Sequence, residues 1–144
     1  MEPNMELTRR KLLAIGASTF AIASITGASA YASLTDDAIA ALTGGAEAGE
    51  GAITITAPEI AENGNTVPVA VDAPGAVAIT LFADGNPTPG VATFKFGPLS
   101  ASRSAATRIR LATTQNVVAV AKMEDGSFQM AKANVKVTIG GCGG

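Results

Sequence analysis

The one cysteine of the sequence, Cys142, lies in the run Gly-Gly-Cys-Gly-Gly that closes the chain. A thiolate is a nucleophile and can hold a covalent cargo, so covalent attachment is the first chemistry to consider here. Glycine has no Cβ and leaves the backbone free to adopt many conformations. The flanking glycines are Gly140, Gly141, Gly143 and Gly144. We therefore predict a thin, flexible arm that carries a covalent cargo on Cys142 from one enzyme to the next.

The composition excludes several other uses of this thiol. The sequence contains no histidine, so a Cys–His nucleophilic pair cannot form within the chain, and the commonest metal ligand is missing. A single cysteine cannot form an internal disulfide. A nucleophile on a free arm also lacks the preorganisation that catalysis needs. The net charge of -2 gives no basic footprint for nucleic acid. We expect no enzymatic activity and no cofactor, and a tail with an incidental cysteine stays open as the alternative.

The N-terminus predicts an export signal. The stretch TRRKLL contains the pair Arg9 and Arg10, and an apolar run over residues 12–25 follows it. Residues 28–32, Ala-Ser-Ala-Tyr-Ala, then offer two small-x-small cleavage patterns. This arrangement is typical of a cleaved twin-arginine signal and predicts a periplasmic protein, with a membrane anchor as the weaker alternative. A lone cysteine in an exported protein indicates either intermolecular pairing or a reactive thiol.

A short helix is predicted after the signal, in the segment SLTDDAIAALTGG. Ser33 followed by Asp36 indicates a capping box at its start. Leu34, Ala38 and Leu42 recur every four residues and predict one apolar stripe. The glycine pair at 44–45 ends the helix. The sequence assigns this helix a packing role and no chemistry.

The remainder alternates with a period of two, which predicts strands. Seven runs show this pattern or a short apolar stretch, and turn residues separate them: 53–56, 66–71, 77–83, 91–97, 107–111, 116–122 and 128–139. Pro68 suggests that its strand lies at a sheet edge, whereas 116–122 is apolar enough for a central strand. We predict an all-β, immunoglobulin-like antiparallel β-sandwich of about seven strands, with a short N-terminal helix.

These patterns divide the chain into four parts. We expect an export signal over 1–32, a helix and linker over 33–50, a β-sandwich over 51–139 and a carrier arm over 140–144. Since the last predicted strand ends at about Ile139, three further residues of extended chain give the thiol a reach of roughly 10 Å beyond the fold.

The chain resembles the SoxY family, the sulfur carriers of the periplasmic thiosulfate-oxidising Sox system. The resemblance runs through the segments APEIAENGNTVPV, ADGNPTPGVATFKFGP and TRIRLATTQNVVAVAKMEDGSFQMAKANVKVTIGGCGG, and VTIGGCGG is its most specific motif. The stretch VDAPGAVAITLFADGNP departs from the family by being compact.

The resemblance implies a heterodimer with a SoxZ-type subunit and a non-enzymatic role for the chain. A SoxAX-type haem cytochrome would join thiosulfate to Cys142 as an S-thiosulfonate. A manganese-dependent SoxB-type hydrolase would then release sulfate and leave a persulfide. Where a SoxCD-type sulfane dehydrogenase is present, it would oxidise the remaining sulfur.

Other readings of the residues stay open. An exported β-sandwich binding module with a structural interchain disulfide at Cys142 is the alternative function. Arg108 and Arg110 alternate along one strand and could attract an anionic partner, although a solvated face is the simpler interpretation. Glu59 and Glu62 lie near a turn and are interpreted as surface charges, not as an acid–base pair.

Overall fold

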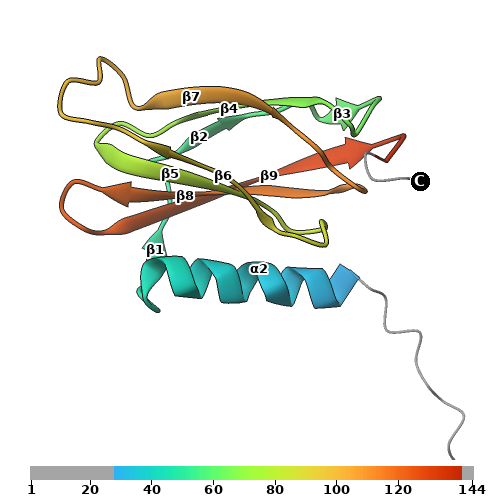
Figure 1. Cartoon of the computed structure of the whole chain (residues 1–144), viewed down its shortest axis with the longest axis horizontal. Coiled ribbons are helices and arrows are strands. Elements are labelled where there is room, and N and C mark those ends of the chain that lie inside the picture. Colours follow the sequence, from blue (N-terminus) through green and yellow to red (C-terminus); the bar gives the residue numbers. More distant parts are fainter. Residues whose placement is uncertain (1–27, 141–144) are drawn as a thin grey trace, which may run out of the picture.

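The computed structural model describes residues 28–140, which fold into one helix and nine strands (Figure 1). The elements are α2 (Ala28–Thr43), β1 (Ala48–Gly49), β2 (Thr54–Thr56), β3 (Ile60–Ala61), β4 (Val67–Asp72), β5 (Ala76–Ala83), β6 (Gly90–Lys95), β7 (Ser104–Ile109), β8 (Gln115–Met123) and β9 (Phe128–Val137). All seven predicted strands are present. β1 and β3, each of two residues, were not predicted.

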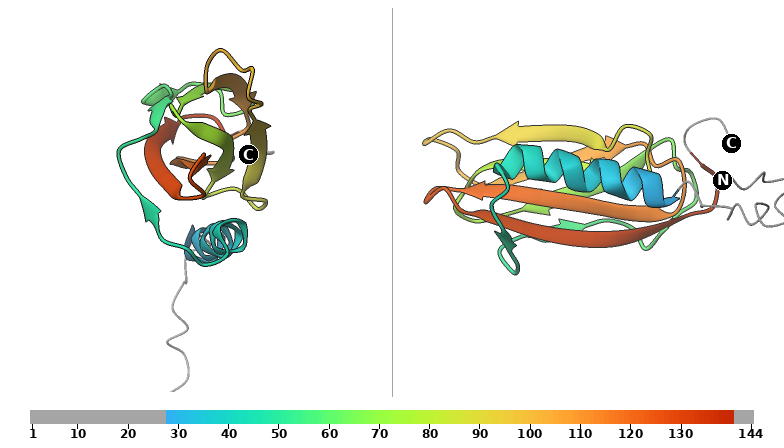
Figure 2. Two further views of the ribbon diagram at one scale, coloured as in Figure 1. Left: turned by 90° about the vertical axis from the view of Figure 1, so that its left-hand side faces the viewer. Right: turned by 90° about the horizontal axis from the view of Figure 1, so that it is seen from below.

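The strands form two sheets that face one another, which confirms the predicted β-sandwich (Figure 2). The larger sheet has the order β1-β9-β8-β5-β6, and β3 also pairs with β9. The smaller sheet has the order β2-β4-β7. Adjacent strands of three or more residues pair antiparallel, as predicted, whereas the two-residue strands β1 and β3 lie parallel to β9. β8 is central, in agreement with its apolar sequence.

The core fills the space between the sheets. Side chains alternate along β4, so Val67, Val69 and Val71 point inward and are buried. Ile79 and Leu81 from β5 meet them from the opposite sheet and are fully buried. Burial of each such side chain stabilises the fold by about 1.5–3 kcal/mol, which lets aliphatic residues build this core almost without aromatic rings.

The prediction that Pro68 marks an edge strand is wrong. Pro68 lies in β4, the middle strand of the smaller sheet, where it is opposite Arg108 of β7. β2 runs beside only Ala70–Asp72 on the other side of β4. Pro68 therefore has a neighbouring strand on one side only, and a position without an N–H is tolerated there.

The helix α2 covers the outer face of the larger sheet (Figures 1 and 2). Ala38 and Ile39 pack against a second apolar cluster formed by Phe82, Val118 and Val120. Gly44 and Gly45 have φ angles of 66° and 82°, and the Gly45 N–H donates to the Ala40 carbonyl, so the glycine pair ends the helix as predicted.

Two predictions about α2 are wrong. The helix begins at Ala28, so Ser33 lies inside it and cannot form the predicted capping box. Leu34 and Leu42 are 46% and 41% exposed, while Thr35 and Thr43 are buried. Thr35 can face the sheet because its hydroxyl donates to the Tyr31 carbonyl at 3.1 Å, which satisfies the polar atom within the helix.

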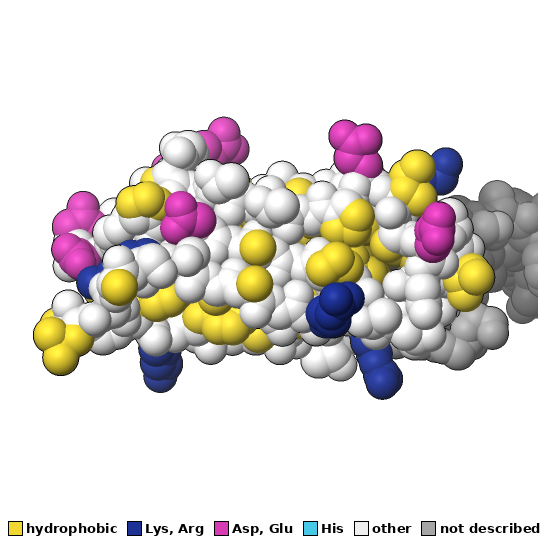
Figure 3. All heavy atoms as spheres, turned by 90° about the horizontal axis from the view of Figure 1, so that it is seen from above, with side chains coloured by type: hydrophobic (Ala, Val, Ile, Leu, Met, Phe, Trp, Pro, Cys, Tyr) yellow, Lys and Arg dark blue, Asp and Glu magenta, His cyan; other side chains and the backbone are white. Residues whose placement is uncertain are grey.

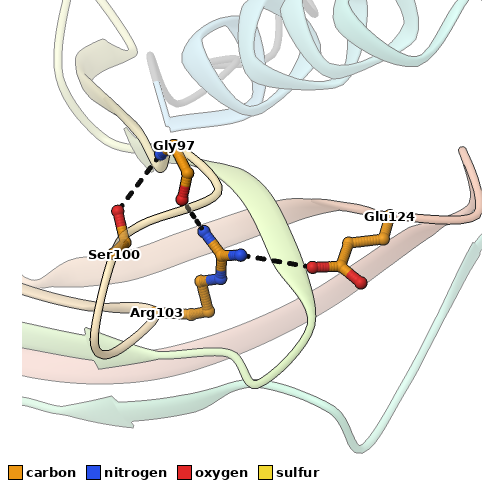
Figure 4. A network of polar contacts seen from close by, with 4 residues as sticks. All are labelled: Gly97, Ser100, Arg103 and Glu124. Atoms are coloured by element: carbon orange, nitrogen blue, oxygen red, sulfur yellow. Dashed lines mark hydrogen bonds and ion pairs between the residues drawn. The ribbon is translucent and has the colours of Figure 1, made fainter.

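Polar contacts hold a loop in place at the end of the sandwich away from Gly140. Arg103 donates to the Gly97 carbonyl at 2.8 Å and pairs with Glu124 at 3.2 Å, which ties the loop between β6 and β7 to the β8–β9 hairpin (Figure 4). The Ser100 hydroxyl closes the same loop by accepting from the Gly97 N–H.

The outer face of the smaller sheet carries few charged side chains over its middle, as Figure 3 shows.

Candidate functional site

The predicted carrier arm begins where the described chain ends. Cys142 lies outside the described residues, as do the arm glycines Gly141, Gly143 and Gly144. The export-signal residues Arg9 and Arg10 also lie outside them. The structure therefore shows the root of the arm, which is the segment from Thr138 to Gly140.

β3 holds the last residues of β9 in place. The Thr138 N–H donates to the Ala61 carbonyl at 3.0 Å, and the Thr138 hydroxyl donates to the Glu62 carbonyl at 3.0 Å. Two residues earlier along β9, the Lys136 N–H donates to the Glu59 carbonyl at 2.9 Å. This parallel pairing extends the edge of the larger sheet to the residue before Ile139.

The buried peptide of Gly64 fixes Ile139 to a second loop. The Gly64 N–H donates to the Ile139 carbonyl at 2.7 Å, and the Gly64 carbonyl accepts from the Leu111 N–H at 2.8 Å. One residue thereby joins the root of the arm to the loop between β7 and β8. Gly64 belongs to the predicted turn Asn63-Gly64-Asn65, but its bridging role was not predicted from the sequence.

Gly140 lies against the same loop. A Cβ on Gly140 would stand 2.3 Å from the carbonyl oxygen of Ala112 and 3.4 Å from its carbonyl carbon. The first distance is far below any van der Waals contact, so no residue with a side chain fits at this position unless the backbone moves. Gly140 is half-buried, whereas Ile139 is 66% exposed. Gly140 thus occupies a position that only glycine fits.

A buried pair of amides supports the loop that Gly140 contacts. Asn86 donates to the Arg110 carbonyl at 2.8 Å and accepts from the Ala112 N–H at 2.9 Å. Gln115 donates to Asn86 Oδ1 at 2.9 Å and accepts from the Gly85 N–H at 2.8 Å. Asn86 and Gln115 are 9% and 5% exposed. The sequence predicted a turn at Asn86 and a strand directly after Gln115, but the pairing of the two amides was missed.

The other candidate residues do not form a catalytic group. The side chains of Glu59 and Glu62 are exposed, in agreement with their interpretation as surface charges. Arg108 and Arg110 are exposed too, and Arg110 is two residues before Ala112, the residue that Gly140 contacts. Among residues 28–140, no group of His, Cys, Asp and Glu side chains is arranged to hold a metal ion. Over that range, no helix is long and apolar enough to cross a membrane.

Comparisons with known proteins agree with the resemblance in the sequence. Residues 39–142 match the family model of the sulfur oxidation protein SoxY. The solved structure of the sulfur carrier protein SoxY from Chlorobium limicola f thiosulfatophilum is 45% identical, with a TM-score of 0.66, and the match covers 75% of this chain and 99% of that one. No curated protein matches the chain in sequence.

More distant structures share the fold alone. A superoxide reductase (neelaredoxin) from Ignicoccus hospitalis is 18% identical, with a TM-score of 0.54 over 60% of this chain and 80% of that one. A protein described as a putative superoxide reductase from Thermotoga maritima is 17% identical, with a TM-score of 0.51 over 63% and 87%. The family model and the 45% identical structure agree along most of the chain, and the chain belongs to the SoxY family of sulfur oxidation proteins.

Proposed function

We propose that this protein is a covalent sulfur carrier in thiosulfate oxidation and that Cys142 is the attachment site. The family match carries the proposal: it extends to residue 142, and a 45% identical relative is a sulfur carrier protein. The sequence contains one cysteine, so no other thiol competes for the role. The described chain ends at Gly140, two residues before this thiol.

The proposed cycle begins with an oxidation. The Cys142 thiolate and the outer sulfur of thiosulfate form an S–S bond, giving Cys-S-S-SO3⁻, and the two electrons released pass to a SoxAX-type haem cytochrome. A SoxB-type hydrolase then adds water to the terminal sulfonate, which leaves as sulfate with two protons, and Cys142 keeps a persulfide. A SoxCD-type dehydrogenase, where present, would take six electrons from that outer sulfur and add three oxygen atoms from water, giving Cys-S-SO3⁻ and six protons. A second hydrolysis would then release sulfate and the free thiol. The carrier itself contributes the thiol and no catalysis.

The hydrogen bonds that hold the chain up to Ile139 support this role. Gly64 and β3 hold the chain up to Ile139, so the thiol is tethered to a rigid body by a short segment. From Gly140, two extended residues span at most about 7 Å, which is shorter than the reach expected from the sequence. A tether of this kind keeps a reactive persulfide at high effective concentration beside a docked enzyme.

The proposal also covers the cellular location of the protein and its partner subunit. A twin-arginine signal over residues 1–32 would deliver the folded chain to the periplasm, paired with a SoxZ-type subunit. α2 begins at Ala28, so cleavage after Ala30 or Ala32 would remove its first residues. Gly140, Gly141, Gly143 and Gly144 would give the arm its freedom to enter the active sites of different enzymes.

Intact mass spectrometry of the protein from cells oxidising thiosulfate tests the function. We expect adducts of one or more sulfur atoms, or of thiosulfate, on the wild-type chain and none on Cys142→Ser. A matched control moves the thiol to exposed Ser102, by Ser102→Cys in the Cys142→Ser background. This control should stay unloaded, since its thiol is on the body and cannot enter a partner's active site.

The alternative function makes a different prediction. If Cys142 serves a structural interchain disulfide, the native protein is a covalent dimer that reductant separates, and no sulfur adduct accumulates. That result, or an unmodified thiol during active thiosulfate oxidation, would refute the carrier function.

A further inference from the structure

We infer that Gly140 is a positioning residue of the carrier, which sets the point and direction in which the arm leaves the fold. The sequence alone assigns Gly140 to the flexible arm together with Gly141, Gly143 and Gly144. The structure instead gives it a close-packing requirement, because a Cβ there would lie 2.3 Å from the Ala112 carbonyl oxygen. The inference rests on the proposed carrier function of Cys142.

Hydrogen bonds oppose a shift of Ala112 away from Gly140. The Ala112 N–H is bound to Asn86 Oδ1 at 2.9 Å, and the preceding residue, Leu111, donates its N–H to the Gly64 carbonyl at 2.8 Å. Leu111 is fully buried. Displacement of Ala112 as a whole would strain these hydrogen bonds, and a buried group left unpaired costs about 1–3 kcal/mol.

Ile139, the residue before Gly140, is also held by a hydrogen bond to Gly64. The Ile139 carbonyl accepts from the Gly64 N–H at 2.7 Å, and Gly64 is buried. Because Gly64 binds both Ile139 and Leu111, one residue holds the segment before Gly140 and the segment before Ala112. A side chain at Gly140 must therefore turn the chain away from Ala112 directly after Ile139.

The consequence for the carrier is geometric. A change in the direction of the chain at Gly140 would move the point from which the arm with Cys142 starts, and a misplacement of about 1 Å can lower the rate of an enzyme-catalysed step up to about 100-fold. Gly140 would thus act on Cys142 through the path of the chain. This role depends on the absence of a side chain at Gly140, whereas a glycine that only makes the arm flexible acts through its backbone conformations.

A distance measurement tests the inference without any enzyme. Nitroxide labels are placed on Cys142 and on Lys122→Cys, an exposed site that the length of β9 separates from the root by about 30 Å. Pulsed electron paramagnetic resonance then gives the distance distribution. We expect Gly140→Ala to shift its mean by several ångströms and Gly97→Ala to leave it unchanged, since a Cβ at Gly97 meets nothing within 4 Å. An unchanged distribution in Gly140→Ala overturns the inference.

Loading kinetics test the consequence. With thiosulfate and the purified SoxAX-type cytochrome, we expect kcat/KM for Gly140→Ala to fall about tenfold or more. Its melting temperature and its alkylation by iodoacetamide should match the wild type, because a small reagent reaches the thiol from any direction. Unchanged loading despite a shifted distance would overturn the positioning role. Failure of the wild-type protein to load would refute the carrier function instead, and the distance measurement would still decide whether Gly140 directs the chain.

Discussion

Gln115 Nε2 donates to Asn86 Oδ1 at 2.9 Å, and both side chains are buried at the end of the sandwich where Gly140 lies. Asn86 satisfies backbone groups of Arg110 and Ala112, and Gln115 satisfies that of Gly85. The pair therefore connects the β5–β6 turn, the β7–β8 loop and the surface against which Gly140 rests.

Asn86→Ala should destabilise the protein by about 2–4 kcal/mol, because it removes the side-chain partners of the Arg110 carbonyl and the Ala112 N–H. It also takes one of two acceptors from the Gln115 amide, which still donates to the Thr113 carbonyl. Urea unfolding followed by circular dichroism measures the change. Asn65→Ala, at an exposed turn, is the control and should stay within about 0.5 kcal/mol. Gln115→Ala combined with Asn86→Ala should cost less than the sum of the single changes, and strict additivity would show that the pair does not act as a unit.

Leu111→Ala should lower the free energy of unfolding by about 2–5 kcal/mol, since Leu111 is fully buried in the core and its truncation leaves a cavity. The same truncation at Leu99, which is 98% exposed, should have almost no effect. Chemical denaturation of both variants provides the comparison. Equal losses in the two variants would contradict the core that the structure describes.

Glu124→Gln should change stability by about 0–1 kcal/mol, because its ion pair with Arg103 lies at the surface (Figure 4). Arg103→Ala should cost more than Glu124→Gln: the Arg103 side chain is only 16% exposed and also donates to the Gly97 carbonyl. Thermal melts at low and high salt separate the two contributions. The effect of Glu124→Gln should shrink with added salt, and a salt-independent loss would exclude an electrostatic origin.

The Asp125 carboxylate should titrate below its ordinary value, because the Ser127 hydroxyl and N–H both donate to it and lower its pKa. A folded-state pKa below the unfolded one means that the contribution to stability is present above the unfolded pKa. That contribution is lost as the pH falls through the folded pKa. Nuclear magnetic resonance titration of the carboxyl carbon measures the shift. Ser127→Ala should raise the pKa of Asp125 towards its ordinary value, and an unchanged titration would exclude the hydroxyl as the cause.

The helix and the strands show where local pattern suffices and where it fails. The strand runs were predictable because alternation of side chains reports directly which face is buried, and the glycine pair at 44–45 ended α2 as predicted. The packing face of α2 was not predictable from its apolar stripe, because Thr35 is buried with its hydroxyl bonded to the Tyr31 carbonyl, whereas Leu34 is 46% exposed. Pro68 failed as an edge marker because the partner strand β2 is too short to reach it.

From its sequence alone, this protein can be assigned a β-sandwich and a single candidate thiol, since periodicity and composition are local properties. The glycine run around Cys142 and its resemblance to a sulfur-carrier family are equally visible in one dimension. Only the tertiary structure decided that Gly140 faces the Ala112 carbonyl and that Gly64 holds Ile139 and Leu111 together. The contacting residues are 28 to 75 positions apart in the chain, and no local pattern records which backbone groups will meet when the two sheets close on one another.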